Sequence, residues 1–243
     1  MELGTAARHR AKFLTLDVRD VPQIGSLRKT LMERHAGIDI LVNNAAVYYP
    51  PVEDPAQFEI QTKTILETNY WGTRNIITAF MPHFNPYCRI VNITSNMAHH
   101  TSGTTEEDVR LRKKLELKFS KISTIHELDG LLRAFQTDVM LGTWREAEWP
   151  SCAYSVSKMA INVYTRQVIT EPTAFIYCGT FCRILQEQLD EDPSKEDVVV
   201  NAIYPATPHS KINQSNIALS DVRVGARLIF FMATSKKNTG NIR

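Results

Sequence analysis

Three short apolar runs, separated by stretches with helical spacing, constrain the fold of this chain more than any other feature. The runs occupy residues 38–46, 89–95 and 198–204, and a long helical stretch at residues 58–80 separates the first two. Short apolar strands that alternate with helices are typical of right-handed βαβ units, in which helices cover both faces of a parallel sheet. The sequence therefore predicts an α/β fold with a doubly wound parallel sheet.

The remaining elements follow from periodicity and from helix-start signals. Asp54 and Pro55 mark the start of the long helix, because Asp caps helices and Pro is favoured in the first turn. Residues 12–18 alternate as in a strand. Residues 169–184 carry Pro172 inside an expected helix and suggest no function. Further helices are expected over residues 23–34, 106–119, 122–139, 151–168 and 221–233. We expect one incomplete domain over residues 1–243, with a helical insertion at about residues 99–150.

Composition limits the partners of this chain. With 243 residues, 43% of them hydrophobic and 22% charged, the chain is typical of a soluble domain with one core. The formal net charge of +2 gives no reason to expect a nucleic-acid partner, and the sequence has no long apolar run that spans a membrane. The N-terminus lacks an apolar signal segment, so we expect a cytoplasmic protein. The basic cluster at residues 112–114 is interpreted as a solvated helix face.

The four cysteines do not show the spacing of a disulfide scaffold or a metal site. We therefore expect reduced thiols and no bound metal. Cys178 and Cys182 are four residues apart and remain a weaker candidate for a redox pair.

Tyr154 and Lys158 are the strongest candidates for chemistry. A lysine four residues after a tyrosine lies on the same helix face, where its ammonium lowers the pKa of the phenol. The alternative is a solvated face with no role. Ligands of parallel α/β sheets bind at the carboxyl ends of strands, and Asp17, Asn44 and Ser95 all follow predicted strands.

In order and in setting, Asn43-Asn44-Ala45-Ala46, Asn69, Ser95 and the Tyr154/Lys158 pair resemble the short-chain dehydrogenase/reductase family. Residues 16–18, 68–74 and 148–154, with the insertion before Tyr154, are similar to the monomeric carbonyl reductases of that family. The resemblance implies a Rossmann-like sheet, a monomer, and NADPH-dependent reduction of a ketone, aldehyde or quinone carbonyl.

The resemblance also assigns catalytic roles. Hydride addition builds negative charge on the carbonyl oxygen, so a proton donor and a second hydrogen-bond donor must converge there. Tyr154 would be the acid, Ser95 the second donor, and Lys158 would tune Tyr154 and hold the nicotinamide ribose. Asn69 would order a water that connects Lys158 to solvent. As alternatives, Ser95 ends a strand and Asn69 is a helix residue that faces water.

The same resemblance assigns binding residues. Asp17 and Val18 would lie near the adenine and Asn44 beside the adenosine ribose, although Asp17 alone also fits a strand-end cap. Gln61 and Trp149 are expected on the substrate side, although a buried tryptophan is as often a core residue. Tyr154, Lys158 and Ser210 complete the expected NADPH contacts, Ser210 in a proline-containing loop where the family usually has threonine.

The chain departs from the family at its ends. A glycine-rich turn for the pyrophosphate is absent, since Gly4 is the only glycine before Gly25. The expected fold is therefore truncated, without its first two strands and its last one, so residues 12–18 either pair directly with residues 38–44 or belong to a fragment that folds poorly. The alternative functions are a catalytically silent truncated reductase and a sugar or steroid dehydrogenase or epimerase. The insertion and Trp149-Pro150 argue against the last.

Overall fold

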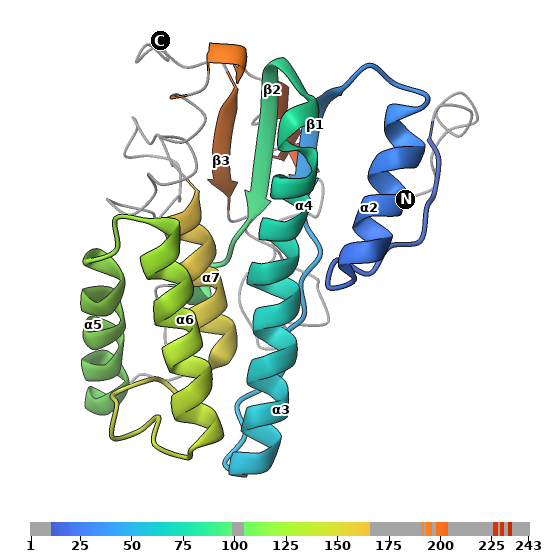
Figure 1. Cartoon of the computed structure of the whole chain (residues 1–243). Helices are drawn as coiled ribbons and strands as arrows, with labels where there is room; N and C mark the ends of the chain where they lie inside the picture. Colours follow the sequence, from blue (N-terminus) through green and yellow to red (C-terminus); the bar gives the residue numbers. More distant parts are fainter. Residues whose placement is uncertain are drawn as a thin grey trace.

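The structure is a computed structural model, and it describes residues 11–98, 105–165, 191, 193–195, 198–203, 226–227, 229–230 and 233–234. Three parallel strands form one sheet in which β2 lies between β1 and β3 (Figure 1). The strands run over Ile38–Asn43 (β1), Phe84–Ile93 (β2) and Val199–Ile203 (β3). The three apolar runs of the sequence are thus confirmed as strands of a parallel sheet.

Helices occupy the connections between the strands, as a parallel sheet requires. Figure 1 shows α3 and α4 as one long rod beside the sheet, with α7 next to it. The helices agree with the predicted ones apart from their ends: Val21–Met32 (α2), Pro55–Leu66 (α3), Thr73–Phe80 (α4), Glu106–Ser120 (α5), Ile125–Met140 (α6) and Ala153–Tyr164 (α7). Short 3-10 turns occur at Met81–His83, Asn96–Ala98 and Pro193–Lys195.

The long helix between β1 and β2 begins as predicted and contains an irregularity that was not predicted. The Asp54 carboxylate accepts the Ala56 N–H at 3.1 Å, and Pro55 occupies the first turn. Between α3 and α4 the chain forms a π-helical turn over Glu67–Gly72, which contains Asn69. Such turns widen a helix and are frequent at functional sites.

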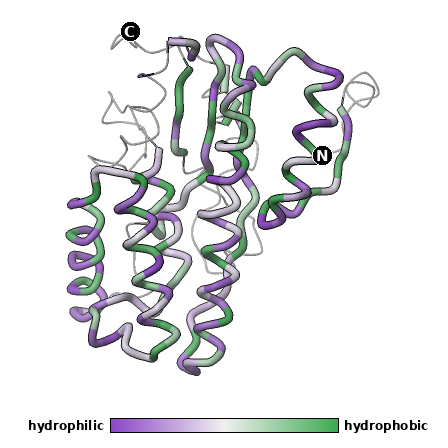
Figure 2. The backbone as a smooth tube through the Cα atoms, in the orientation of Figure 1, coloured by the Kyte–Doolittle hydropathy of each residue, from purple (hydrophilic) through white to green (hydrophobic). Residues whose placement is uncertain are grey.

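The two faces of the sheet are covered by different parts of the chain. Cys88, Ile90 and Val200 belong to the large core, which also contains residues of α3, α4, α6 and α7. Val91 and Ile203 point to the opposite face, where Ala233 packs against them. Figure 2 shows the hydrophobic residues along β2 and β3 that this arrangement buries. β2 and β3 thus have buried apolar side chains on both faces of the sheet.

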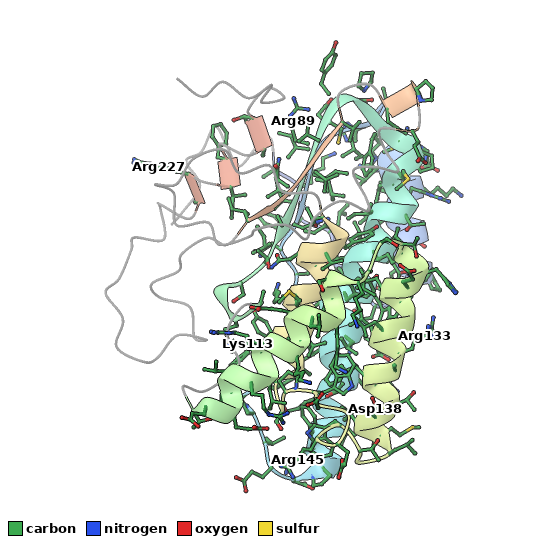
Figure 3. All side chains as sticks on the ribbon, turned by 90° about the vertical axis from the view of Figure 1, so that its left-hand side faces the viewer. Arg89, Lys113, Arg133, Asp138, Arg145 and Arg227 are labelled. Atoms are coloured by element: carbon green, nitrogen blue, oxygen red, sulfur yellow. The ribbon has the colours of Figure 1, made fainter. Side chains whose placement is uncertain are left out.

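Two helices, α5 and α6, lie before α7, in the segment where the sequence suggested a helical insertion. Capping boxes begin both of its helices, with Thr105 at the start of α5 and Thr124 at the start of α6. α6 packs against α3 and α7, and α5 packs against α7. Lys113 is exposed on the outer side of α5 (Figure 3), which agrees with the interpretation of residues 112–114 as a helix face in contact with solvent.

The strand predicted at residues 12–18 is wrong. These residues form no strand, and among the described residues β1 pairs with β2 alone. Phe13 is 88% exposed. Val18, in contrast, packs closely on Gly72 in the π-helical turn before α4: a side-chain Cβ added at Gly72 would lie 2.6 Å from Val18. Alternation alone does not make a strand, because a strand also needs a neighbour that pairs with its backbone groups. Direct pairing with β1 is therefore also wrong in this structure.

A cavity of about 400 Å³ follows the unpaired side of β1. Its walls are mainly apolar side chains of α2, β1 and α4, including Leu27, Val42 and Ile76, and Asn44 lies at its end. Ile40 and Val42 remain 46% and 40% exposed. The apolar face of β1 is thus only partly covered by the described residues.

Several expectations fall outside the described residues: those on residues 169–184, on the loop at 205–210 and on most of the helix at 221–233. Of that helix, residues 226–227, 229–230 and 233–234 are described and are helical. None of the helices that the structure describes has the length and apolar character needed to cross a membrane.

Candidate active site

α7 carries the candidate proton donor and its lysine, and both are buried. Tyr154 is 7% exposed and Lys158 is 3% exposed, as part of a helix whose residues are all buried. The alternative of a solvated Tyr/Lys face is therefore wrong. The helix begins after Cys152 without a side-chain cap, and the Ser157 hydroxyl donates to the Tyr154 carbonyl at 2.8 Å.

Lys158 connects α7 to the end of β2. Its Nζ donates to the Ile93 carbonyl at 2.7 Å and lies 5.6 Å from the centroid of the Tyr154 ring. Burial disfavours the charged ammonium and lowers the pKa of Lys158 to about 8. Because this value lies above 7, most of the lysine is protonated at neutral pH, so a positive charge stands over the phenol ring.

Ser95 lies two residues beyond β2 and is 9% exposed. Its Oγ accepts the Met97 N–H at 3.2 Å, within the loop that leads into the 3-10 turn Asn96–Ala98. That turn packs against α7, and the hydroxyl of Thr94 donates to the Lys158 carbonyl at 3.4 Å. The carboxyl end of β2 is thereby held against the helix that carries Tyr154.

Asn69 joins three parts of the site. Its Oδ1 accepts the Val47 N–H at 2.8 Å, and its Nδ2 donates to the Val47 carbonyl at 3.0 Å and to Ser157 Oγ at 3.1 Å. The side chain is 2% exposed, so the alternative of a helix residue that faces water is wrong. The π-helical turn places this amide between the loop after β1 and α7. Its role in ordering a water stays a prediction.

The predicted cofactor residues lie in two places. Asn44 lines the cavity beside β1, and the preceding Asn43 donates from Nδ2 to Asn92 Oδ1 at 2.8 Å, which ties β1 to β2. Asp17 forms an ion pair with Arg19 at 2.7 Å, and the hydrogen bonds from Arg19 lower the pKa of Asp17 to about 2. Val18 packs on the π-helical turn. Ser210 lies outside the described residues.

Two of the predicted substrate residues, Gln61 and Trp149, take part in none of the hydrogen bonds described above between α7, β2 and Asn69. Trp149 is 2% exposed, its indole N–H donates to Asp138 at 2.8 Å, and its ring centroid is 4.9 Å from that of Phe135. Figure 3 shows Asp138 near the end of α6. Trp149 thus occupies a core position of the insertion. Gln61 is half-buried on α3. Substrate contact by either residue stays a prediction.

Tyr48 is a residue of the site that the sequence reasoning missed. Its ring centroid is 5.1 Å from that of Tyr154, with the ring planes at 86°. Burial raises the pKa of Tyr48, as does the nearby Cys152. The available signal was its place two residues after the Asn-Asn-Ala-Ala run, near the carboxyl end of a strand where ligands bind.

The arrangement can support proton donation to a ligand oxygen. A buried phenol lies beside a buried ammonium, and the hydroxyl of Ser95 is held at the adjacent strand end. Such a set stabilises negative charge that develops on an oxygen during hydride addition. The structure therefore brings together Asn69, Ser95, Tyr154 and Lys158.

Comparison with known proteins agrees with this geometry. A family model described as short chain dehydrogenase matches residues 1–105. Carbonyl reductase (NADPH) 1 of Macaca fascicularis is 36% identical over 156 residues, which are 64% of this chain and 54% of that protein. Carbonyl reductase (NADPH) 3 of Mus musculus is 32% identical over 196 residues, which are 80% of this chain and 62% of that protein. The chain thus spans between half and two thirds of the length of these relatives.

Solved structures share the fold. Salutaridine reductase of Papaver somniferum superposes with a TM-score of 0.69 at 18% identity, over 95% of this chain and 80% of that one. Menthone neomenthol reductase of Mentha piperita gives a TM-score of 0.51 at 25% identity, over 63% of this chain and 64% of that one. The Rossmann-like parallel sheet expected from the sequence is thereby confirmed.

Proposed function

Since this chain belongs to the short-chain dehydrogenase/reductase family, we propose that it is built to reduce a ketone, aldehyde or quinone carbonyl with NADPH. The observation that carries the proposal is the buried Tyr154/Lys158 pair, which Asn69 and the end of β2 hold in place. Burial of the Lys158 ammonium costs stability, and a catalytic use explains why this group lies beside Tyr154.

The proton part of the reaction belongs to this chain. Tyr154 donates its phenolic proton to the carbonyl oxygen, and the charge of Lys158 favours the phenolate that remains. Ser95 supplies the second hydrogen bond to that oxygen. Asn69 holds the loop after β1 and orders a water that links Lys158 to solvent, and the phenolate of Tyr154 recovers its proton from solvent through Lys158. On the substrate side we propose Gln61, which is half-buried, whereas Trp149 keeps its core position.

The residues present fit the two riboses of the cofactor and leave its pyrophosphate without a binding turn. Lys158 has three N–H groups, one of which is used by Ile93, so others are available to ribose hydroxyls. Asn44, at the end of the cavity beside β1, suits the adenosine ribose, and Asp17, Val18 and Ser210 complete the contacts. When bound, NADPH supplies the hydride. The sequence has no glycine-rich turn for the pyrophosphate, so binding rests mainly on the ribose contacts and is weak.

We also propose a cytoplasmic monomer, with neither nucleic acid nor membrane as partner. The packing of α5 and α6 supports the monomer. These helices cover α7 and part of α3, so the covered helix surfaces cannot pack against a second subunit. Light scattering coupled to size-exclusion chromatography tests this part, and a stable dimer or tetramer contradicts it.

The test of the reductase is NADPH oxidation, followed by its absorbance, with menadione and an aromatic aldehyde as carbonyl substrates. We expect slow oxidation that depends on the carbonyl compound and disappears in Tyr154→Phe. Calorimetry with NADPH measures the weak binding separately. Oxidation that persists in Tyr154→Phe refutes the proposed acid, and tight NADPH binding refutes the argument about the missing turn.

A second candidate is a catalytically silent chain that acts through protein contacts. The partly covered face of β1, with Ile40 and Val42 exposed, favours it. Absence of both NADPH binding and oxidation in a folded chain would select this candidate.

A further inference from the structure

Tyr48 is the aromatic neighbour of the proposed proton donor. The two rings meet nearly at right angles, 86° between planes and 5.1 Å between centroids. They come from distant elements, Tyr48 from the loop after β1 and Tyr154 from α7. Edge-to-face contacts of this kind are favourable but weak, so they hold a fixed geometry only where the backbones are also fixed.

A chain of hydrogen bonds fixes these backbones. Val47, directly before Tyr48, is bonded through both its N–H and its carbonyl to the Asn69 amide, at 2.8 and 3.0 Å. The same amide donates to Ser157 Oγ, and the Ser157 hydroxyl donates to the carbonyl of Tyr154 at 2.8 Å. The backbones of Tyr48 and Tyr154 are therefore linked through the hydrogen bonds of Val47, Asn69 and Ser157.

The two rings differ in exposure to solvent. Tyr154 is 7% exposed, whereas Tyr48 is only half-buried. The next residue, Tyr49, interacts with Arg19 and is 38% exposed, so it serves another surface. Of the two rings in contact, that of Tyr48 is therefore the one more accessible to a ligand.

We propose that Tyr48 is a specificity-determining residue of the carbonyl site, whose ring forms a wall for a flat substituent on the carbonyl carbon. The inference rests on the proposed function, because it assumes that a carbonyl oxygen binds at Tyr154. A carbonyl oxygen that is hydrogen-bonded to the Tyr154 phenol places the substituents of the carbonyl carbon close to Tyr48, because the rings of Tyr48 and Tyr154 are in contact. A flat aromatic ring packs against such a wall more closely than a saturated ring does.

Two ketones of matched size test the wall: acetophenone, with a phenyl ring, and cyclohexyl methyl ketone, with a saturated one. Their dissociation constants are measured on the full chain by ligand-observed NMR, with NADPH present and absent. We expect acetophenone to bind roughly twofold to tenfold more tightly, the range of a single aromatic contact. Tyr48→Phe should keep this ratio, and Tyr48→Leu should bring it close to one.

Tyr49→Leu is the matched control and should keep the preference of the unmodified chain. The ratio of two ligands is insensitive to general damage, because partial unfolding weakens both equally. The proposal is overturned by an unchanged ratio in Tyr48→Leu, by equal affinities in the unmodified chain, or by the binding of neither ketone. NADPH oxidation is measured separately. If the ratio of the two dissociation constants depends on Tyr48 but no NADPH is oxidised, the proposed reductase activity is refuted and the role of Tyr48 in ligand binding is kept.

Discussion

Asn69→Leu should destabilise this chain strongly, although leucine is close to asparagine in size. The substitution removes three hydrogen bonds, two to the backbone of Val47 and one to Ser157 Oγ. Each such bond contributes about 1 kcal/mol net, and a backbone group left without a partner costs more where water does not reach it. Because Val47 is only half-buried, water partly replaces the lost partners. We therefore expect a loss of about 2–4 kcal/mol in the free energy of unfolding.

Asn162 provides a matched control on the same helix as Ser157. It is 1% exposed, and both polar atoms of its side chain are buried with no hydrogen-bond partner among the residues that the structure covers. An apolar replacement removes polar atoms whose burial is unfavourable, so Asn162→Leu should be neutral or stabilising. The same substitution on the same residue type thus has opposite expected signs at the two positions.

Urea unfolding followed by circular dichroism measures both variants. Hydrogen exchange adds a local measurement, because the Val47 amide should exchange faster in Asn69→Leu and at an unchanged rate in Asn162→Leu. An Asn69→Leu variant that loses less than about 0.5 kcal/mol, below a single typical bond, would sink the idea that this amide holds the site together.

Three further outcomes follow from the described contacts. Burial lowers the pKa of Lys158 from its ordinary 10.5 to about 8, so between these pH values the unfolded chain binds more protons than the folded one. The free energy of unfolding should therefore rise with pH in this range, by up to about 3 kcal/mol. Urea unfolding should show this rise in the unmodified chain and a smaller one in Lys158→Met. Tyr70→Phe removes the hydroxyl that donates to Asp129 at 2.9 Å, where Asp129 also forms an ion pair with Arg74. The free energy of unfolding in urea should fall by about 1–3 kcal/mol. The control Tyr87→Phe, at a 58% exposed site, should show no loss. Thr124→Ala removes one half of a capping box and should cost about 1 kcal/mol, with faster amide exchange confined to the first turn of α6.

Much of the fold could be predicted because its signals are local. The apolar runs of β1, β2 and β3 and the helical spacing between them follow from burial on a two-sided sheet. Asp54 could be placed because a cap needs only its own turn. The strand at residues 12–18 could not be excluded from its own pattern, because pairing depends on a neighbouring strand that the pattern does not reveal.

The candidate site divides in the same way. Tyr154 and Lys158 could be found because four residues separate two groups on one helix face. Tyr48 and the bonds of Asn69 to Val47 could not, because they depend on how a loop meets a helix far away in sequence. The π-helical turn that aims Asn69 has no pattern that separates it from an ordinary helix.

The hydrogen bonds also show which half of the proposed reaction depends on which part of the chain. Lys158 is held by the end of β2, and Asn69 holds the loop after β1 to α7. The unpaired side of β1 contributes to none of these bonds. The proton-donating group can therefore be complete while the groups beside β1 bind a cofactor weakly. It follows that the affinity for NADPH, and not the order around Tyr154, separates an active reductase from a silent one.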